Sequence, residues 1–304
     1  MINISAQKFF LIAAVAAQFL HPLPAVAGKI TLSWTPTVVF SEDQDNIVVR
    51  GAIEIGNSGD EGTLDVSPVF RLATWEWAGE PKNIDANGKQ SWAVEAVFPK
   101  SRLSCSADPG CAGLTLPEKG DFPLLLRITY HDLNHYQFSA VEVRSASIGT
   151  IDPNLKGLLR VPTILPLLII DGEGEKFTGS VELNNISDNL HKAAVAVVSA
   201  SEIVVGTPFH SVELAPHSIT RTPFTLENFS GLVGNSYRAF AVVQWESQGY
   251  RVFVQAVKTV NLTKVSAAGT LFGLIWALSG FSAALILGAV FFHLRRPKTP
   301  KPRS

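Results

Sequence analysis

Two ten-residue stretches of this chain, GAIEIGNSGD at 51–60 and GSVELNNISD at 179–188, are versions of one pattern at an offset of 128 residues. Apolar residues flank a glutamate in both stretches, and an Asn and an Asp follow where a strand gives way to a turn. The pattern predicts a chain built twice from one β-rich design. The matched pairs are Gly51 and Gly179, Glu54 and Glu182, Asn57 and Asn185, and Asp60 and Asp188.

The remaining sequence between residues 28 and 264 is also typical of strands. IVVRGAIEI, RITYHDLNHYQFSAVEV and RAFAVVQWESQGYRVFVQAV are rich in β-branched and aromatic residues and alternate in polarity. We therefore predict an all-β ectodomain of two tandem β-sandwiches of common design, at 29–149 and 160–263, with a linker at 150–159.

The two cysteines predict a small disulfide loop. Cys105 and Cys111 close a loop around Asp108, Pro109 and Gly110 if the chain enters an oxidising compartment. Two free thiols are the alternative, and two cysteines alone are too few ligands for a metal site. The second copy is shorter where the first carries these cysteines, so we interpret the loop as an insertion into the first domain.

The N-terminus predicts a secretory signal peptide at 1–27. Lys8 precedes the apolar run FFLIAAVAAQFL, and Ala25 and Ala27 form the small-residue pattern of a cleavage site. An uncleaved membrane anchor is the alternative, but the run is short for a spanning helix. The mature chain is therefore expected outside the cytoplasm.

A second apolar segment predicts one transmembrane helix at 268–294. It is long enough to span a bilayer, and the basic tail at 295–304, RRPKTPKPRS, indicates a cytoplasmic C-terminus. This topology predicts a single-pass protein of the inner membrane, with its domains in the periplasm or at the cell surface. Small residues at helical spacing are typical of a face that packs on another helix, in a homo-oligomer or a larger complex. The alternative is a helix that serves only as a tether, because glycine and alanine are common in membrane helices. The small residues are Gly269, Gly273, Gly280, Ala284 and Gly288.

Several motifs resemble the immunoglobulin-like modules of bacterial envelope proteins, of which the CARDB and NEW3 types are examples. They are a strand ending in E-x-x-N, a later V-x-L-x-P-x-S turn, and a final hairpin with an aromatic residue before its turn. The order of signal peptide, two domains, membrane helix and basic tail is similar to that of WxL-interacting proteins. The resemblance implies adhesion or scaffolding at the cell envelope. The turn residues are Val212, Leu214, Pro216 and Ser218.

Two groups of side chains are candidate ligand sites. Carboxylates spaced by two in the equivalent acidic loops could converge on calcium, although a solvated turn is the simpler interpretation. Tryptophans on one face of a strand could form a platform for sugars, or could cover the core of the first domain. The calcium candidates are Asp43, Asp45, Asp171, Glu173 and Glu175, and the platform candidates are Trp75, Trp77 and Trp92.

Composition and motifs argue against several classes of function. The formal net charge of −1 gives no indication of nucleic-acid binding, and the sequence holds no nucleophile elbow, P-loop or H-E-x-x-H motif. We therefore expect no enzyme and no cofactor. The sequence predicts a membrane-anchored module that binds a protein partner in the envelope, with a membrane-tethered carbohydrate-binding module as the alternative.

Overall fold

The computed structural model describes residues 29–105, 108–150, 162–172 and 175–263, and these residues form an all-β structure. The predicted signal peptide, the segment 268–294 with its helix-packing residues, and the basic tail lie outside the described residues, as does most of the predicted linker. Within the described ranges, no helix has the length and apolar character needed to cross a membrane. The predictions for both ends of the chain therefore stay predictions.

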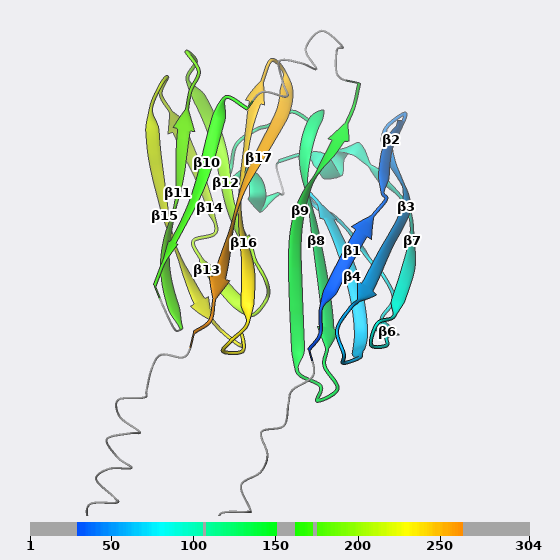
Figure 1. Ribbon diagram of the computed structural model, residues 1–304. Helices are drawn as coiled ribbons and strands as arrows, with labels where there is room; N and C mark the ends of the chain where they lie inside the picture. Colours follow the sequence, from blue (N-terminus) through cyan, green and yellow to red (C-terminus); the bar gives the residue numbers. More distant parts are fainter. Residues whose placement is uncertain (1–28, 106–107, 151–161, 173–174, 264–304) are drawn as a thin grey trace, which may run out of the picture. The chain divides into compact units, whose positions relative to one another are not determined.

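Seventeen strands and two short 3-10 helices make up the described part of the chain (Figure 1). The first half contains β1 (Leu32–Pro36), β2 (Val39–Asp43), β3 (Asn46–Asn57), β4 (Thr63–Leu72), β5 (Trp75–Ala78), β6 (Lys82–Ile84), β7 (Lys89–Pro99), η1 (Lys100–Leu103), η2 (Pro109–Cys111), β8 (Gly120–His131) and β9 (Gln137–Ile148). The second half contains β10 (Ile164–Asp171), β11 (Lys176–Asn185), β12 (His191–Ser199), β13 (Ile203–Gly206), β14 (Phe209–Leu214), β15 (Ile219–Asn228), β16 (Ser236–Ser247) and β17 (Tyr250–Asn261).

The described chain divides into two compact units, whose limits do not follow the repeat. Unit 1 holds residues up to Phe70, together with Glu76–Pro99 and Ile128–Phe138. Unit 2 holds Arg71–Trp75, Lys100–Arg127 and the chain from Ser139 onward. The cysteine loop, the first part of β8 and most of β9 therefore belong to the same unit as β10 to β17.

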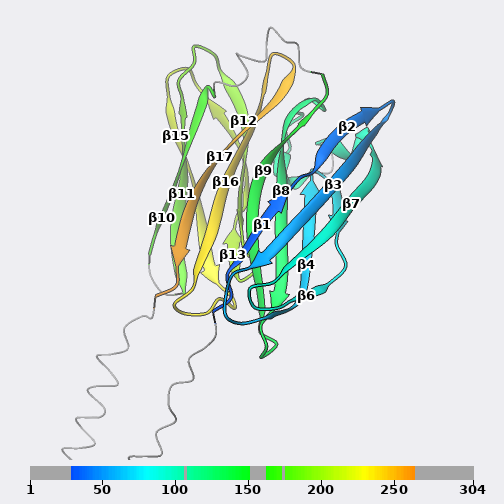
Figure 2. The ribbon, with the colours of Figure 1, turned by 45° about the vertical axis from the view of Figure 1, so that its right-hand side comes forward.

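In unit 1, β3 is the centre of a four-stranded sheet. One side of β3 pairs with β7 over its whole length, and the other side pairs with β1 and then β2. Figure 2 shows β1 and β2 as successive stretches along β3. The edge is interrupted at Thr37, whose amide donates to the carbonyl of Ala52 at 2.8 Å. Gly51 faces this interruption, where a Cβ atom would overlap the Thr37 carbonyl.

Unit 2 is built in three layers. The sheet β10-β11-β15-β13 packs on the strands β14-β12-β16-β17, and the apolar side chains between them form the main core. The opposite face of β12 and β16 carries a second apolar cluster, in which Ala196, Phe240 and Val242 contact Val141 and Val143 of β9. The β12 and β16 strands are therefore buried on both faces, whereas an ordinary two-layer sandwich buries one.

The repeat predicted from 51–60 and 179–188 is present in the strand pairing. Gly51 lies opposite Val94 and Glu54 opposite Ser91 in the β3–β7 pair. Gly179 lies opposite Phe224 and Glu182 opposite Arg221 in the β11–β15 pair. The partners in β7 and β15 differ by the same number of residues at both positions, from 94 to 224 and from 91 to 221. The pair β3–β7 is therefore equivalent to the pair β11–β15, each within its own sheet.

The repeated asparagine has the same structural task in both copies. Asn185 is fully buried, and its side-chain amide donates to the carbonyls of Asn189 at 2.8 Å and Ala215 at 2.9 Å. Its Oδ1 accepts from the amide of Ser187 at 3.1 Å. Asn57 donates in the same way to the carbonyl of Glu61 at 2.6 Å. The motif thus encodes a strand end and a turn, as predicted, and the asparagine that holds the turn is buried.

The cysteine loop is closed by a disulfide and attached to the β16–β17 hairpin. Cys105 and Cys111 are bonded with an S–S distance of 2.06 Å, which confirms the predicted pair. Arg251 donates to the carbonyls of Pro117 at 3.1 Å and Leu103 at 3.2 Å, and to Cys105 Sγ at 3.0 Å. The insertion is therefore fixed in unit 2 by a residue far along the chain.

Candidate functional site

A cavity of about 200 Å³ lies in unit 2 and is the candidate site. It is lined by residues from the end of β4, the cysteine loop, β8, β9, β12, β14 and β16, all of which belong to unit 2. The lining includes Arg71, Asp108, Pro123, Leu125, Arg127, Val143, Ala196, Val198, Phe209, Val242 and Gln244.

Strand alternation explains which side chains reach the cavity. On β8, Pro123, Leu125 and Arg127 share one face, while Leu124 and Leu126 on the other face are buried. On β16 the same alternation separates Val242 from Val243, and Val243 belongs to the main core of the unit. The cavity therefore lies in the second apolar layer and has an apolar floor.

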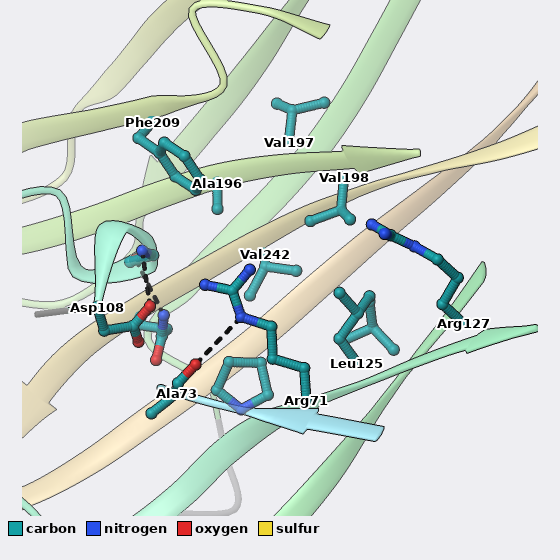
Figure 3. A pocket seen from close by; sticks show the side chains of 14 residues that line it. Arg71, Ala73, Asp108, Leu125, Arg127, Ala196, Val197, Val198, Phe209 and Val242 are labelled. Atoms are coloured by element: carbon teal, nitrogen blue, oxygen red, sulfur yellow. Dashed lines mark hydrogen bonds between the residues drawn. The ribbon is translucent and has the colours of Figure 1, made fainter. Parts of the chain in front are cut away.

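Two guanidinium groups, one amide and the carboxylate of Asp108 supply the polar side chains of the cavity. Arg71 Nε donates to the carbonyl of Ala73 at 3.2 Å. Arg127 Nε is buried and has no hydrogen-bond partner among the described residues. In Figure 3 the Arg71 side chain extends toward the centre of the view, and Arg127 runs beside Leu125 toward Val198.

Gln244 and Asp108 complete the cavity on the side of the cysteine loop. Gln244 Nε2 donates to the carbonyl of Gly110 at 3.1 Å, whereas its Oε1 is buried without a partner in the described part of the chain. Asp108 caps η2 by accepting from the amide of Gly110 at 2.9 Å. The amide of Gln244 thus ties the disulfide loop to the cavity.

This arrangement is suited to an anionic group attached to an apolar body. Guanidinium groups bind carboxylates and phosphates through several donors, and two of them line this cavity. The apolar floor would hold the rest of such a ligand. Nothing about the lining supplies a nucleophile with a neighbouring base, so binding is the chemistry that it supports.

Three shifted pKa values lie elsewhere in unit 2 and have structural causes. Burial lowers the pKa of Arg251 to about 10, and the carboxylates of Asp108 and Glu118 oppose that shift. Burial also lowers the pKa of His191. Burial raises the pKa of Tyr237, whose hydroxyl accepts from the amide of Leu232 at 3.2 Å. Each group is part of the packing, and none lines the cavity.

The three candidate tryptophans do not form an exposed platform. Trp75 is 8 % exposed and Trp92 is 3 % exposed, because both side chains are packed in the core. Trp92 also donates from its indole nitrogen to the carbonyl of Glu80 at 2.7 Å. Trp77 is half-buried beside Phe70, with 5.6 Å between ring centroids. The simpler interpretation, a structural role for these rings, fits this burial.

The acidic loops occupy strand ends, and the structure assembles no metal cluster from them. Asp43 ends β2 and Asp45 lies in the two-residue turn before β3, while Asp171 ends β10. Glu175 contributes a backbone carbonyl, which accepts from the amide of Asn228 at 2.7 Å, and Glu173 lies outside the described residues. No group of three His, Cys, Asp or Glu residues in the described ranges could hold a metal ion.

The sequence contains a pattern that indicates the layer in which the cavity lies. AAVAVVS in β12 and AFAVVQW in β16 are almost continuously apolar, which indicates strands buried on both faces. That pattern indicates a further layer over these strands. Within P-L-L-L-R of β8, the period of two puts Arg127 on the same face as Pro123 and Leu125. The partners of these strands are far apart in sequence, so their meeting could not be read from local patterns.

Comparisons with known proteins give no family for this chain. No family model matches it, and no curated protein matches it either. Solved structures with similar folds include red sea bream transglutaminase, at a TM-score of 0.26 and 11 % identity, over 86 % of this chain and 34 % of that one. They also include native Escherichia coli alpha-2-macroglobulin, at a TM-score of 0.28 and 11 % identity, over 77 % of this chain and 17 % of that one.

The YadV chaperone is similar at a TM-score of 0.25 and 14 % identity, over 75 % of this chain and 99 % of that one. This chain thus spans about a third or less of the first two structures. Overall similarities this low carry no argument about function, so the function has to be argued from the chain itself.

Proposed function

We propose that this protein is a membrane-anchored, extracytoplasmic scaffold with immunoglobulin-like sandwiches, which binds another protein of the cell envelope. The observation that carries the proposal is the arginine-lined cavity. A volume of about 200 Å³ admits a few side chains and is too small for a folded domain. We therefore infer that the partner inserts a short segment that bears a carboxylate and apolar side chains.

The predicted signal peptide and C-terminal apolar segment support the extracytoplasmic, anchored part of the proposal. The disulfide between Cys105 and Cys111 agrees with it, because such bonds persist in oxidising compartments. The same disulfide loop contributes Asp108 and Gly110 to the cavity lining. An oxidising compartment would thus also keep the cavity intact.

Photo-crosslinking in intact cells tests this function. A photoreactive residue at Phe209, which lines the cavity and is 42 % exposed, should capture a specific envelope protein. The matched control is the same residue at Val204, which is 48 % exposed and does not line the cavity. Replacing both Arg71 and Arg127 by Gln should abolish capture at position 209. Binding in the cavity would be refuted if positions 209 and 204 gave the same adducts, or if the double arginine variant gave as much adduct at position 209 as the parent protein.

A further inference from the structure

The connection between β15 and β16 presents apolar side chains to solvent. Phe229, Leu232 and Val233 are 77 %, 43 % and 53 % exposed. No charged residue occurs between Glu227 and Arg238 in the sequence. We call residues 229–235 the apolar loop. Several exposed apolar side chains on one uncharged loop mark an interaction site, because scattered surface residues would not gather in this way.

The apolar loop is held in a fixed shape by hydrogen bonds and packing. The amide of Phe229 donates to the carbonyl of Glu202 at 2.8 Å, and the amide of Gly231 donates to Asn228 Oδ1 at 2.6 Å. A Cβ atom on Gly231 would crowd Leu262 and Tyr237, so the loop lies directly on them. The exposed side chains are therefore presented by a preorganised loop.

The apolar loop lies where the chain leaves unit 2. The amide of Gly234 donates to the carbonyl of Leu262 at 2.6 Å, and the amide of Leu262 donates to the carbonyl of Asn235 at 3.0 Å. Figure 1 shows β17, in orange, ending at the same end of unit 2 as the connection from β15 to β16. The sequence that follows has no Asp, Glu, Lys or Arg between Lys264 and Arg295.

We propose that the apolar loop inserts into the interfacial layer of the lipid bilayer that anchors the chain. The inference rests on the anchored part of the proposed function. Five residues, 263–267, separate Leu262 from the predicted start of the helix at 268, so the connection spans at most about 20 Å. The bilayer surface is thus within reach of the loop, and interfacial apolar groups enter it by about 5–10 Å.

The charged residue before the apolar loop, Glu227, is paired with Lys176 at 3.5 Å, and the charged residues that follow the loop and Leu262 are basic. The first charged residue after the loop is Arg238, which is exposed, and the first charged residue after Leu262 is Lys264. Basic side chains beside an apolar patch match anionic headgroups. The exposed aromatic ring of Phe229 is the kind of side chain that enters the interface between water and acyl chains. The loop would give unit 2 a second contact with the membrane and so fix its orientation there.

Site-specific fluorescence in reconstituted vesicles tests this inference. The described residues contain no free cysteine, and the sequence has only Cys105 and Cys111, so one added cysteine takes the label. Full-length Val233→Cys and Leu190→Cys variants, labelled with an environment-sensitive dye, enter phosphatidylcholine and phosphatidylglycerol vesicles. Leu190 is 55 % exposed in the β11–β12 connection, at the opposite end of β11 from the apolar loop. Leu232→Cys provides a second label position in the loop.

The dye at 233 should emit at shorter wavelength than the dye at 190. Lipids that carry a quencher near the headgroup should reduce the emission of the dye at 233 severalfold more than that of the dye at 190. Equal emission and equal quenching at 190, 232 and 233 would overturn the inference. Alkaline extraction of the same vesicles separates the two proposals. A chain that stays in the bilayer with a water-exposed loop refutes only the insertion, whereas a chain released by alkali refutes the anchor and the insertion together.

Discussion

At the scale of single residues, the repeated Asn explains why the two copies keep the same sequence. Each asparagine sits in the protein interior at the end of a strand, where several backbone carbonyls turn inward. Only a side chain with both a donor and an acceptor satisfies the carbonyls and also caps the amide two residues on. Backbone hydrogen bonding therefore explains the repeated asparagine, and no ligand is needed to explain it.

Asn185→Ala should lower the free energy of unfolding by about 1–3 kcal/mol, because it leaves buried carbonyls without donors. The matched control is Asn184→Ala, since Asn184 is only half-buried and points to the other face of β11. That change should stay within about 0.5 kcal/mol. Chemical denaturation of the two variants and the parent protein gives both values. Equal effects at 184 and 185 would contradict the assigned role.

The repeated glycines are required for different reasons, and double mutants separate them. A Cβ atom on Gly179 would overlap mainly the ring of Phe224, with the Ile169 carbonyl at 2.9 Å, whereas one on Gly51 would meet only the backbone at Thr37 and Val38. Gly179→Ala and Phe224→Leu together should therefore cost less stability than the sum of the two single changes. Gly51→Ala and Val94→Ala should be additive, because Val94 does not cause the clash. Denaturation of the four single and two double variants tests this, and additivity in both pairs would refute it.

At the scale of elements, the sequence predicted the all-β structure and the equivalent strands, because alternation and turn residues are local signals. It also placed the disulfide, since only two cysteines are available. It did not predict that the insertion would be held by Arg251, because the partners Leu103 and Pro117 are more than a hundred residues away. The cavity was missed for the same reason, since its arginines and its apolar floor meet only in the folded chain.

The cysteine loop provides a test at this scale. Arg251→Gln should leave carbonyls of the loop without donors, and should reduce the free energy of local opening by about 1–3 kcal/mol. Amide hydrogen exchange across residues 103–118 should then become about tenfold faster or more. Arg238→Gln, an exposed change on β16, is the control and should leave exchange in these residues unchanged. Unchanged exchange in the Arg251 variant would show that the disulfide alone fixes the loop.

At the scale of the whole molecule, the repeat and the packing describe different divisions of the chain. The repeat predicts folding domains at 29–149 and 160–263. The compact units instead assign the cysteine loop and most of β9 to unit 2, where Val141 and Val143 cover the second face of β12 and β16. A duplicated chain can thus keep two equivalent strand patterns while one copy supplies part of the other's packing.

Fragments distinguish these two divisions. A fragment of residues 160–263 lacks Val141 and Val143, so Phe240 and Val242 would face water. It should unfold at a lower denaturant concentration than the protein spanning 29–263, and should bind an apolar dye. Val242→Thr places a hydroxyl in the second cluster, so it should destabilise the longer protein by about 1–3 kcal/mol and leave the fragment nearly unchanged.

Val243→Thr is the matched control for this experiment, because Val243 faces the main core between the two sheets in both proteins. It should destabilise the fragment and the longer protein to a similar extent. The informative quantity is thus the difference between neighbouring positions, which removes the general cost of the change from Val to Thr. If Val242→Thr also destabilises both proteins equally, the 160–263 region folds as an autonomous domain. The second apolar cluster would then contribute little to its stability.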